Sequence, residues 1–307
     1  MFKQSFLEID PNKIINEIKQ KGYFCFSEAL SNNFLDNLKK EINLSHPSIN
    51  KNTAGPVWSN TQYYFTHALA SSKNYFDLLT SPFIRSIAKS KFNDYFRLKC
   101  HRYYETYSGH SMEWHADNVT NEGEVTDVDG LIFIIYINDV FDGEFQLIEG
   151  TNKERKKEKG TYNYTNNFIE QNYKDQIKTF SMPAGSIIIY DTFHIHRAKP
   201  ILNKKFVRKS IFFQIDSSDK HSEKLIVNPE FFNTKESINN ENLEYLGFGK
   251  TAEFDAIPVT DERDLPISQI KHFSFKLLRA LLVNIYRKLI NTILSHDQKM
   301  KYYEYRR

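Results

Sequence analysis

Six short runs of β-forming residues follow one another between residues 96 and 216, and they restrict the fold more than any other feature. The runs are FRLKCHRYYETY, MEWHADN, GLIFIIYIND, GEFQLIEG, SIIIYDTFHIH and VRKSIFFQID, with Gly, Asn, Asp and Pro between them. No helix of about 10 to 15 residues separates consecutive runs, which argues against a parallel α/β sheet. The pattern predicts a β-sandwich or β-barrel.

The segments around this stretch have other patterns. Residues 1–95 contain two helical periods on either side of the short strand GYFCFSEAL, then the irregular stretch 46–73, and we expect them to pack on the core as helices and a loop. The polar stretch 151–179 is interpreted as an insertion between strands, either a solvated excursion or a lid. The pattern predicts a β core at 96–218 and an irregular extension at 219–266.

The composition is that of a globular protein, for which we expect a cytoplasmic location. Hydrophobic residues make up 40% of the chain and charged residues 26%, and 307 residues are enough for one large domain with an appendage. Cys25 and Cys100 are too few for a disulfide framework, so we expect reduced thiols. The N-terminal residues lack the basic and apolar segments of a secretory signal.

The positive charge is concentrated at the C-terminus. Residues 267–307 hold nine Lys and Arg against two acidic residues, a net charge of +7, so the remaining 32 basic and 36 acidic residues give the body −4. This body has no nucleic-acid footprint. The helical period at 267–296 is amphipathic, and two interpretations stay open: packing on the domain or on another subunit, or peripheral contact with an anionic membrane. Monomer and homodimer are both compatible with the sequence.

Two sequence segments supply candidate metal ligands. In Trp114-His115-Ala116-Asp117, residues two apart on a strand project to one face, so His115 and Asp117 would lie side by side. A second apolar strand ends in His194 and His196. One of these histidines would complete a set of two histidines and one carboxylate, which suits non-haem Fe(II) because it leaves coordination positions open.

A third segment, Val207-Arg208-Lys209-Ser210-Ile211, carries a candidate carboxylate anchor. Alternation along a strand places Arg208 and Ser210 on one face, and an arginine there can bind a carboxylate through two parallel hydrogen bonds. This strand begins about a dozen residues after His196, and we expect it to lie beside the strand that carries that histidine.

Together these segments resemble the phytanoyl-CoA dioxygenase-like branch of the Fe(II)/2-oxoglutarate-dependent dioxygenases. The resemblance covers about residues 14–216 and rests on Gly22-Tyr23, the Trp-His-x-Asp strand, Asp191 five residues before His196, and the Arg-x-Ser strand. It departs from the family where Gly150-Thr151-Asn152 replaces the usual Gly-Ser-His turn.

The resemblance implies a mainly β fold with flanking helices and a double-stranded β-helix (jelly-roll, cupin-like) catalytic core. It implies Fe(II) on His115, Asp117 and His196, with 2-oxoglutarate and O₂ as co-substrates. The distal carboxylate of 2-oxoglutarate would bind Arg208 and Ser210, with Tyr136 against it.

The implied activity is hydroxylation of a small molecule, coupled to oxidative decarboxylation of 2-oxoglutarate to succinate. The carboxylate of Asp117 favours hydroxylation over halogenation, because related halogenases have a small residue there. His194 would then lie near the iron or touch the substrate. Two alternatives remain: a non-catalytic jelly-roll binding protein, and a cupin-type metal-dependent isomerase or hydrolase. The identity of the substrate stays open.

Overall fold

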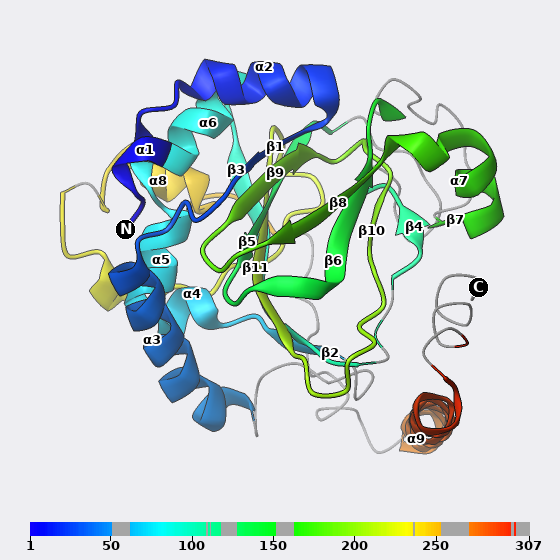
Figure 1. The fold of residues 1–307 in the computed structure, drawn as a ribbon. Helices are drawn as coiled ribbons and strands as arrows, with labels where there is room; N and C mark the ends of the chain where they lie inside the picture. Colours follow the sequence, from blue (N-terminus) through cyan, green and yellow to red (C-terminus); the bar gives the residue numbers. More distant parts are fainter. Residues whose placement is uncertain are drawn as a thin grey trace.

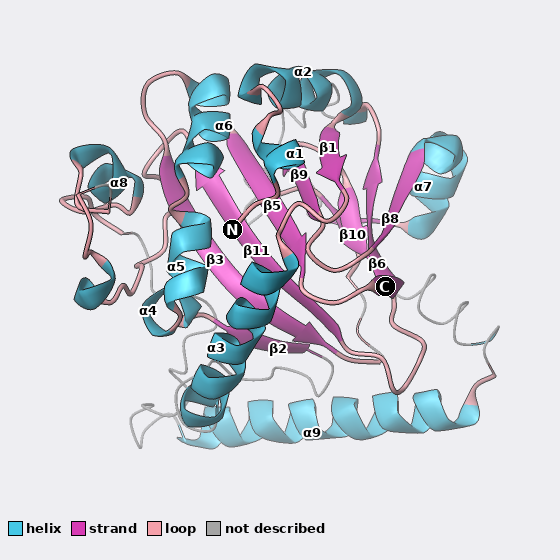
Figure 2. Cartoon of the chain, turned by 60° about the vertical axis from the view of Figure 1, so that its left-hand side comes forward, coloured by secondary structure: helices cyan, strands magenta, loops and turns pink. Residues whose placement is uncertain are grey.

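Two antiparallel β-sheets face each other in the computed structural model, and helices cover the outer face of the larger sheet (Figure 1, Figure 2). The structure describes residues 1–50, 62–108, 110, 112–117, 128–151, 163–235, 237–252, 270–295 and 298. Apolar side chains from both sheets meet between them, including Ile132 and Ile188 of the larger sheet and Leu147 and Phe180 of the smaller.

The larger sheet has six strands in the order β1-β9-β5-β11-β3-β2. Their bounds are β1 (Tyr23–Phe26), β9 (Ile187–Asp191), β5 (Gly130–Tyr136), β11 (Arg208–Asp216), β3 (Arg97–Thr106) and β2 (Gln62–Phe65). The longest pairing joins β11 to β3, and β11 also pairs with β5, so β11 lies in the middle of the sheet. Both edge strands, β1 and β2, come from the segment before residue 96.

The smaller sheet has five strands in the order β7-β4-β10-β6-β8. Their bounds are β7 (Asn163–Tyr164), β4 (Trp114–His115), β10 (His196–Ala198), β6 (Val140–Ile148) and β8 (Ile177–Met182). Behind this sheet, Trp114, Ile148 and Ile195 form a small apolar cluster with Ile169 of helix α7 (Asn166–Tyr173). A short 3₁₀ helix, η2 (Lys174–Gln176), connects α7 to β8.

Side chains that alternate along a strand point either into the core under the helices or into the space between the sheets. On β11, Ile211, Phe213 and Ile215 join the large apolar core under the helices. Arg208 and Ser210, on the opposite face, line a cavity between the sheets. The face assignment expected for this strand from its sequence is confirmed. The expectation that it lies beside the strand of His196 is wrong, because β11 belongs to the larger sheet and β10 to the smaller one.

The helices of the N-terminal half bury their apolar sides against the larger sheet (Figure 2). They are α1 (Gln4–Leu7), α2 (Pro11–Lys21), α3 (Asn32–Asn50), α4 (Ala68–Ser71), α5 (Lys73–Leu79) and α6 (Pro82–Phe92). Helix α2 begins after Asp10, whose carboxylate accepts from the N–H of Asn12, and ends at Gly22 with a φ of 99°. The extension after β11 contributes η3 (Pro229–Phe231) and α8 (Asn240–Tyr245).

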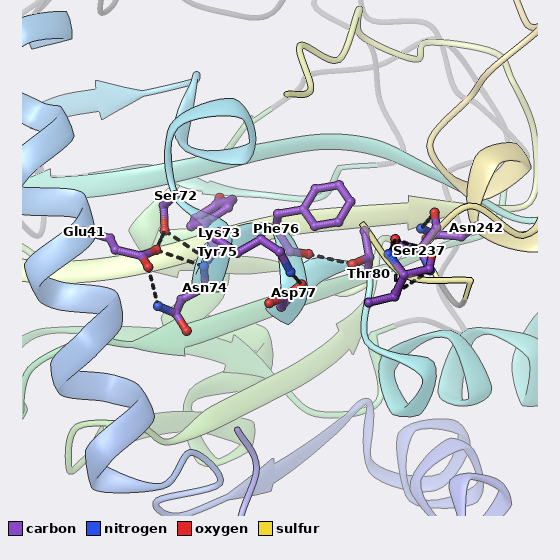
Figure 3. Close-up of polar contacts among 11 residues, drawn as sticks. Glu41, Ser72, Lys73, Asn74, Tyr75, Phe76, Asp77, Thr80, Ser237 and Asn242 are labelled. Carbon is purple, nitrogen blue, oxygen red and sulfur yellow. Dashed lines mark hydrogen bonds and ion pairs between the residues drawn. The ribbon is translucent and has the colours of Figure 1, made fainter. Parts of the chain in front are cut away.

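Polar contacts join helix α3 to the start of helix α5 (Figure 3). The Glu41 carboxylate on α3 accepts hydrogen bonds from Ser72 Oγ, at 2.6 Å, and from the Asn74 N–H, at 2.9 Å. Ser72 in turn accepts from the Tyr75 N–H at 3.0 Å and so caps α5. One carboxylate therefore ties α3 to the start of α5.

The C-terminal helix α9 (Ile270–Ile293) runs along the periphery of the molecule (Figure 2). Its described side chains from Leu278 to Ile293 are largely exposed, so they are not packed on the body. Among the described residues, no helix combines the length and apolarity that crossing a membrane requires.

The fold confirms mostly antiparallel sheets with flanking helices and differs in detail from the sequence expectation. The stretch 46–73, expected to be a loop, contains the end of α3, then β2 and α4, while 51–61 lie outside the described residues. The stretch 151–179 contains β7, α7 and the start of β8. The sequence does not predict strand β8, because Phe180 is its one buried side chain and the others are half-buried or exposed.

Acid should destabilise this fold through His101, which lies 3% exposed on β3 with its Nδ1 3.2 Å from the Tyr75 hydroxyl. Burial, with a smaller contribution from the Arg102 charge, lowers the pKa of His101 to about 3. The unfolded chain binds this proton near pH 6.5, so the stabilisation is complete above that pH and is lost as the pH falls towards 3. We expect the free energy of unfolding to fall by about 1.4 kcal/mol per pH unit for this group.

Urea unfolding of the metal-free protein between pH 7 and pH 4 measures this slope. His101→Gln should flatten it, whereas His221→Asn, outside the core, should not. Equal slopes for the native protein and His101→Gln would contradict the assignment.

Candidate metal centre and cavity

The backbone pairing of β4 with β10 brings two histidines to one place. His196 pairs directly with His115, and directly opposed residues of antiparallel strands project to the same face. Their ring centroids are 4.4 Å apart, and both side chains are buried. Strand β7 pairs with β4 on its other side and thus holds this two-residue strand in the sheet.

Asp117 joins the two histidines, although the geometry differs from the expected one. Strand β4 ends at His115, so Asp117 lies in the turn after the strand and not on it. Its Oδ1 is 3.7 Å from His115 Nε2, and its Oδ2 is 3.4 Å from His196 Nε2. The ligand atoms of the three residues all lie within 4.8 Å of one another. The expected set is therefore assembled, by a turn instead of strand alternation.

The hydrogen bonds of both imidazoles orient their Nε2 atoms as acceptors. His115 Nδ1 is 2.7 Å from the Glu113 carbonyl, and His196 Nδ1 is 2.9 Å from the His194 carbonyl. A carbonyl can only accept, so each Nδ1 carries a proton, and each Nε2 presents a lone pair when it carries none. Two such lone pairs beside a carboxylate form a donor set that fits a divalent cation.

Burial also keeps His196 in the form that binds metal. It lowers the pKa of His196 to about 4, and the neighbouring Asp117 carboxylate only partly opposes this shift. The ring is therefore neutral near pH 7, and no proton has to leave it when a cation binds.

A cavity of about 340 Å³ opens between the sheets at these three residues. His115, Asp117 and His196 line one side of it, and Arg208, Ser210 and Tyr136 line it from the larger sheet. The six site residues predicted from the sequence thus surround a single space. Apolar side chains complete much of the wall, among them Ile134, Phe145 and Phe212.

Arg208 is a buried cation without a carboxylate partner in the described part of the chain. Its Nη1 donates to the Gly143 carbonyl, its Nη2 is 3.4 Å from Thr106 Oγ1, and its buried Nε has no hydrogen-bond partner. Burial lowers the pKa of Arg208 from its usual value. An unpaired guanidinium in a cavity is costly, which makes this position fit an anionic ligand.

Other buried arginines of the molecule show the contrast. Arg97 Nη1 is 3.0 Å from Asp219, and Arg102 binds Glu223 with two nitrogens, one of them at 2.8 Å. Arg85 is 3.5 Å from Glu241. Arg208 is therefore distinguished from these three by its lack of a carboxylate. Arg197, a further buried arginine at the cavity, donates to the side-chain oxygens of Gln146 and Asn166.

Tyr136 and Ser210 are neighbours on the sheet, since Ser210 pairs with Tyr136 across β11 and β5. The Tyr136 hydroxyl accepts from the Phe145 N–H at 3.1 Å and donates to the Phe180 carbonyl at 3.2 Å. Burial raises the pKa of Tyr136 to about 12, so this hydroxyl stays protonated. Its hydrogen bonds contact β6 and β8, and the residue is among those that line the cavity.

Sequence reasoning missed a polar wall of the cavity formed by the charged residues Lys99 and Arg102 and by Gln214. Lys99 Nζ is 3.3 Å from Asp216, and Gln214 Nε2 donates to Asp216 at 2.7 Å. Burial is the largest single effect and opposes the charge of Lys99, but nearby negative groups, Asp216 first among them, together outweigh it and raise the pKa of Lys99. The signal was present: charged residues inside a strand are unusual unless they are paired.

The His194 side chain is not among the residues that line the cavity, which corrects the expectation that it shares a face with His196. Residues 192–195 form a turn between β9 and β10, so the two-residue period does not apply. Its Nδ1 is 2.7 Å from Asp191 Oδ1, and its buried Nε2, without a hydrogen-bond partner, lies against Gly22. His194 orients His196 through its backbone carbonyl instead.

Comparison with known proteins places the fold but finds no sequence relative. No family model and no curated protein sequence matches the chain. Solved structures match well, however. The carbocyclase SnoK from nogalamycin biosynthesis, described as non-heme and alpha ketoglutarate dependent, is 13% identical with a TM-score of 0.52, over 67% of this chain and 84% of SnoK.

Two further structures contain bound cofactor. HygX from Streptomyces hygroscopicus, with nickel, 2-oxoglutarate and hygromycin B, is 10% identical with a TM-score of 0.53, over 69% of this chain and 89% of HygX. The epimerase SnoN, with Fe3+, alpha ketoglutarate and nogalamycin RO, is 13% identical with a TM-score of 0.53, over 75% of this chain and 91% of SnoN.

The chain is thus similar in fold to these three structures, and at 10–13% identity the likeness concerns the fold alone. The phytanoyl-CoA dioxygenase-like branch is not confirmed.

The contact between His194 and Gly22 gives a prediction about this fold. A Cβ on Gly22 would lie 2.1 Å from His194 Nε2, and the φ of 99° disfavours any side chain. We expect Gly22→Ala to reduce the free energy of unfolding by about 2–4 kcal/mol, because backbone strain adds to the clash. Gly249→Ala is the matched control, since Gly249 has a φ of 73° and nothing within 4 Å of its Cβ position. Equal losses in urea unfolding would contradict the proposed clash.

Proposed function

We propose that this protein is an Fe(II)- and 2-oxoglutarate-dependent oxygenase of the phytanoyl-CoA dioxygenase-like type, with a double-stranded β-helix core. It hydroxylates a small molecule and converts 2-oxoglutarate to succinate. The observation that carries the proposal is one cavity lined both by two Nε2 acceptors with a carboxylate and by an arginine without a carboxylate partner in the described chain. The first group suits Fe(II), and the second suits the distal carboxylate of 2-oxoglutarate.

Each residue has a role derived from its position. His115, Asp117 and His196 hold one side of the iron, and the Glu113 and His194 carbonyls fix the orientation of the two imidazoles. Arg208 and Ser210 hold the far end of 2-oxoglutarate. When bound, iron and 2-oxoglutarate supply the oxidising chemistry that activates O₂ towards a C–H bond.

The protein itself orients the substrate and limits the access of water. The apolar side chains Ile134, Phe145 and Phe212 line the cavity, and the Tyr136 ring adds to this wall. A substrate in this cavity would also contact the polar wall formed by Lys99, Arg102 and Gln214. Because Lys99 and Arg102 are already paired with buried carboxylates, this wall offers hydrogen bonds with little net charge.

The proposed outcome of the reaction is hydroxylation. Hydroxylation is favoured by the carboxylate at Asp117, which occupies a coordination position that a halide would need. SnoK and SnoN are named for cyclisation and epimerisation, so the product assay has to distinguish these outcomes from hydroxylation.

Replacement of Arg208 should weaken 2-oxoglutarate binding selectively. We expect Arg208→Ala to raise the KM for 2-oxoglutarate roughly 10- to 100-fold, the loss of a charge-assisted hydrogen-bonded pair. Affinity for Fe(II) should change little, because Arg208 is not among the candidate metal ligands. Succinate production against 2-oxoglutarate concentration gives the KM, with Lys205→Ala, on the exposed surface, as the control. An unchanged KM would show that 2-oxoglutarate binds elsewhere.

Replacement of Asp117 tests the metal site independently of turnover. We expect Asp117→Ala to lower Fe(II) affinity at least about 100-fold, since one of three ligands is lost. Anaerobic titration with Fe(II) and then 2-oxoglutarate should give a visible charge-transfer band in the native protein and in Asp175→Ala, whose carboxylate is exposed. Iron binding without that band would favour the cupin-type isomerase, and no iron binding would favour a non-catalytic protein.

A further inference from the structure

Helix α9 carries an apolar surface that the described structure leaves exposed. Leu278, Leu281, Leu282, Ile285, Leu289 and Ile293 are between 47% and 73% exposed. Single exposed apolar residues are ordinary, but six on one helix form a contiguous stripe of the kind that marks an interaction surface.

The spacing of these residues places them on one side of the helix. Successive members are one, three or four positions apart, which is the period of a helix face. At about 100° per residue, Arg279 and Lys288 fall about 90° to either side of the centre of this stripe. Both basic side chains are exposed. The apolar stripe is therefore bordered by a cation on each side.

The charge of the segment identifies the partner. Between residues 270 and 296 the sequence has Lys and Arg at five positions (271, 276, 279, 287 and 288) and no Asp or Glu. A second copy of the helix would bring the same positive charges together, and no acidic residue of the helix could pair with them. A surface that accepts apolar side chains and attracts cations is the headgroup region of an anionic membrane.

We propose that α9 binds the surface of a membrane that contains anionic lipids, with its axis in the membrane plane. The stripe from Leu278 to Ile293 enters the boundary between headgroups and acyl chains, and Arg279 and Lys288 contact lipid phosphates. This binding is independent of the metal centre, so it can stand or fall separately from the proposed oxygenase activity.

Co-sedimentation of the full-length protein with vesicles tests the proposal. We expect binding to vesicles of phosphatidylcholine with about one third phosphatidylglycerol, and at least tenfold weaker binding to phosphatidylcholine alone. Raising the salt concentration should weaken the binding, because exposed charges are screened. Equal binding to both vesicles, or binding to neither, would overturn the proposal.

Two double variants separate the apolar contribution from the charged one. Leu282→Asp with Leu289→Asp should abolish binding, and Arg279→Glu with Lys288→Glu should weaken it at least about tenfold, since each basic residue contributes roughly fivefold. Ile238→Asp and Lys220→Glu are matched controls, because both residues are exposed outside α9. Either control losing as much binding as its α9 counterpart would contradict the assignment to the helix.

Light scattering on the same samples addresses self-association. A dimer that Leu282→Asp with Leu289→Asp converts to a monomer, together with no vesicle binding, would assign the stripe to a second copy of the chain and overturn the membrane proposal. A native protein that binds anionic vesicles, with an unchanged mass in solution for the variant, supports it.

Discussion

The antiparallel pairing of His115 with His196 is the contact on which the candidate site depends. Both strands are short, so a small number of backbone hydrogen bonds decides which side chains face the cavity. A shift of one residue would turn Trp114 or Arg197 inward and the imidazoles outward. The neighbours prevent this: β6 pairs with β10 over three residues, and β7 holds the other side of β4.

The distribution of buried charge distinguishes Arg208 from the arginines that form buried ion pairs. Arg97 and Arg102 lie against carboxylates, and those pairs join β3 to the extension that follows β11. Arg208 instead contacts a carbonyl and a hydroxyl, which leaves much of its charge uncompensated by the described residues. Removing such a charged group from water lowers the stability of the fold unless a partner of opposite charge compensates for the lost hydration. A bound dicarboxylate would do so, and 2-oxoglutarate would then stabilise the fold as well as take part in the chemistry.

The sequence predicted the parts of the site that regular strands determine. Alternation placed Arg208 and Ser210 on one face and Ile211 on the other, and the order of the strands brought His115 near His196. Where the backbone leaves the strand conformation, the same rule failed.

Two positions show this limit. Asp117 reaches the histidines from a turn, and His194 turns away from them because the residues between β9 and β10 are not extended. Charged residues inside a strand indicate that Lys99 and Arg102 are paired, but their partners, Asp216 and Glu223, lie far along the chain. Only the tertiary structure shows which residues these partners are.

The two edges of the larger sheet have a consequence for dissecting this protein. Both are formed by four-residue strands from the first 65 residues, β1 against β9 and β2 against β3. A short edge strand offers few free backbone groups to another chain. A fragment that began at residue 96 would lack both strands and would leave four more residues of each neighbour unpaired on one side, residues 187–190 of β9 and 103–106 of β3. The N-terminal strands therefore reduce the edge that the β core offers to another chain, and a fragment without them would be more prone to aggregate.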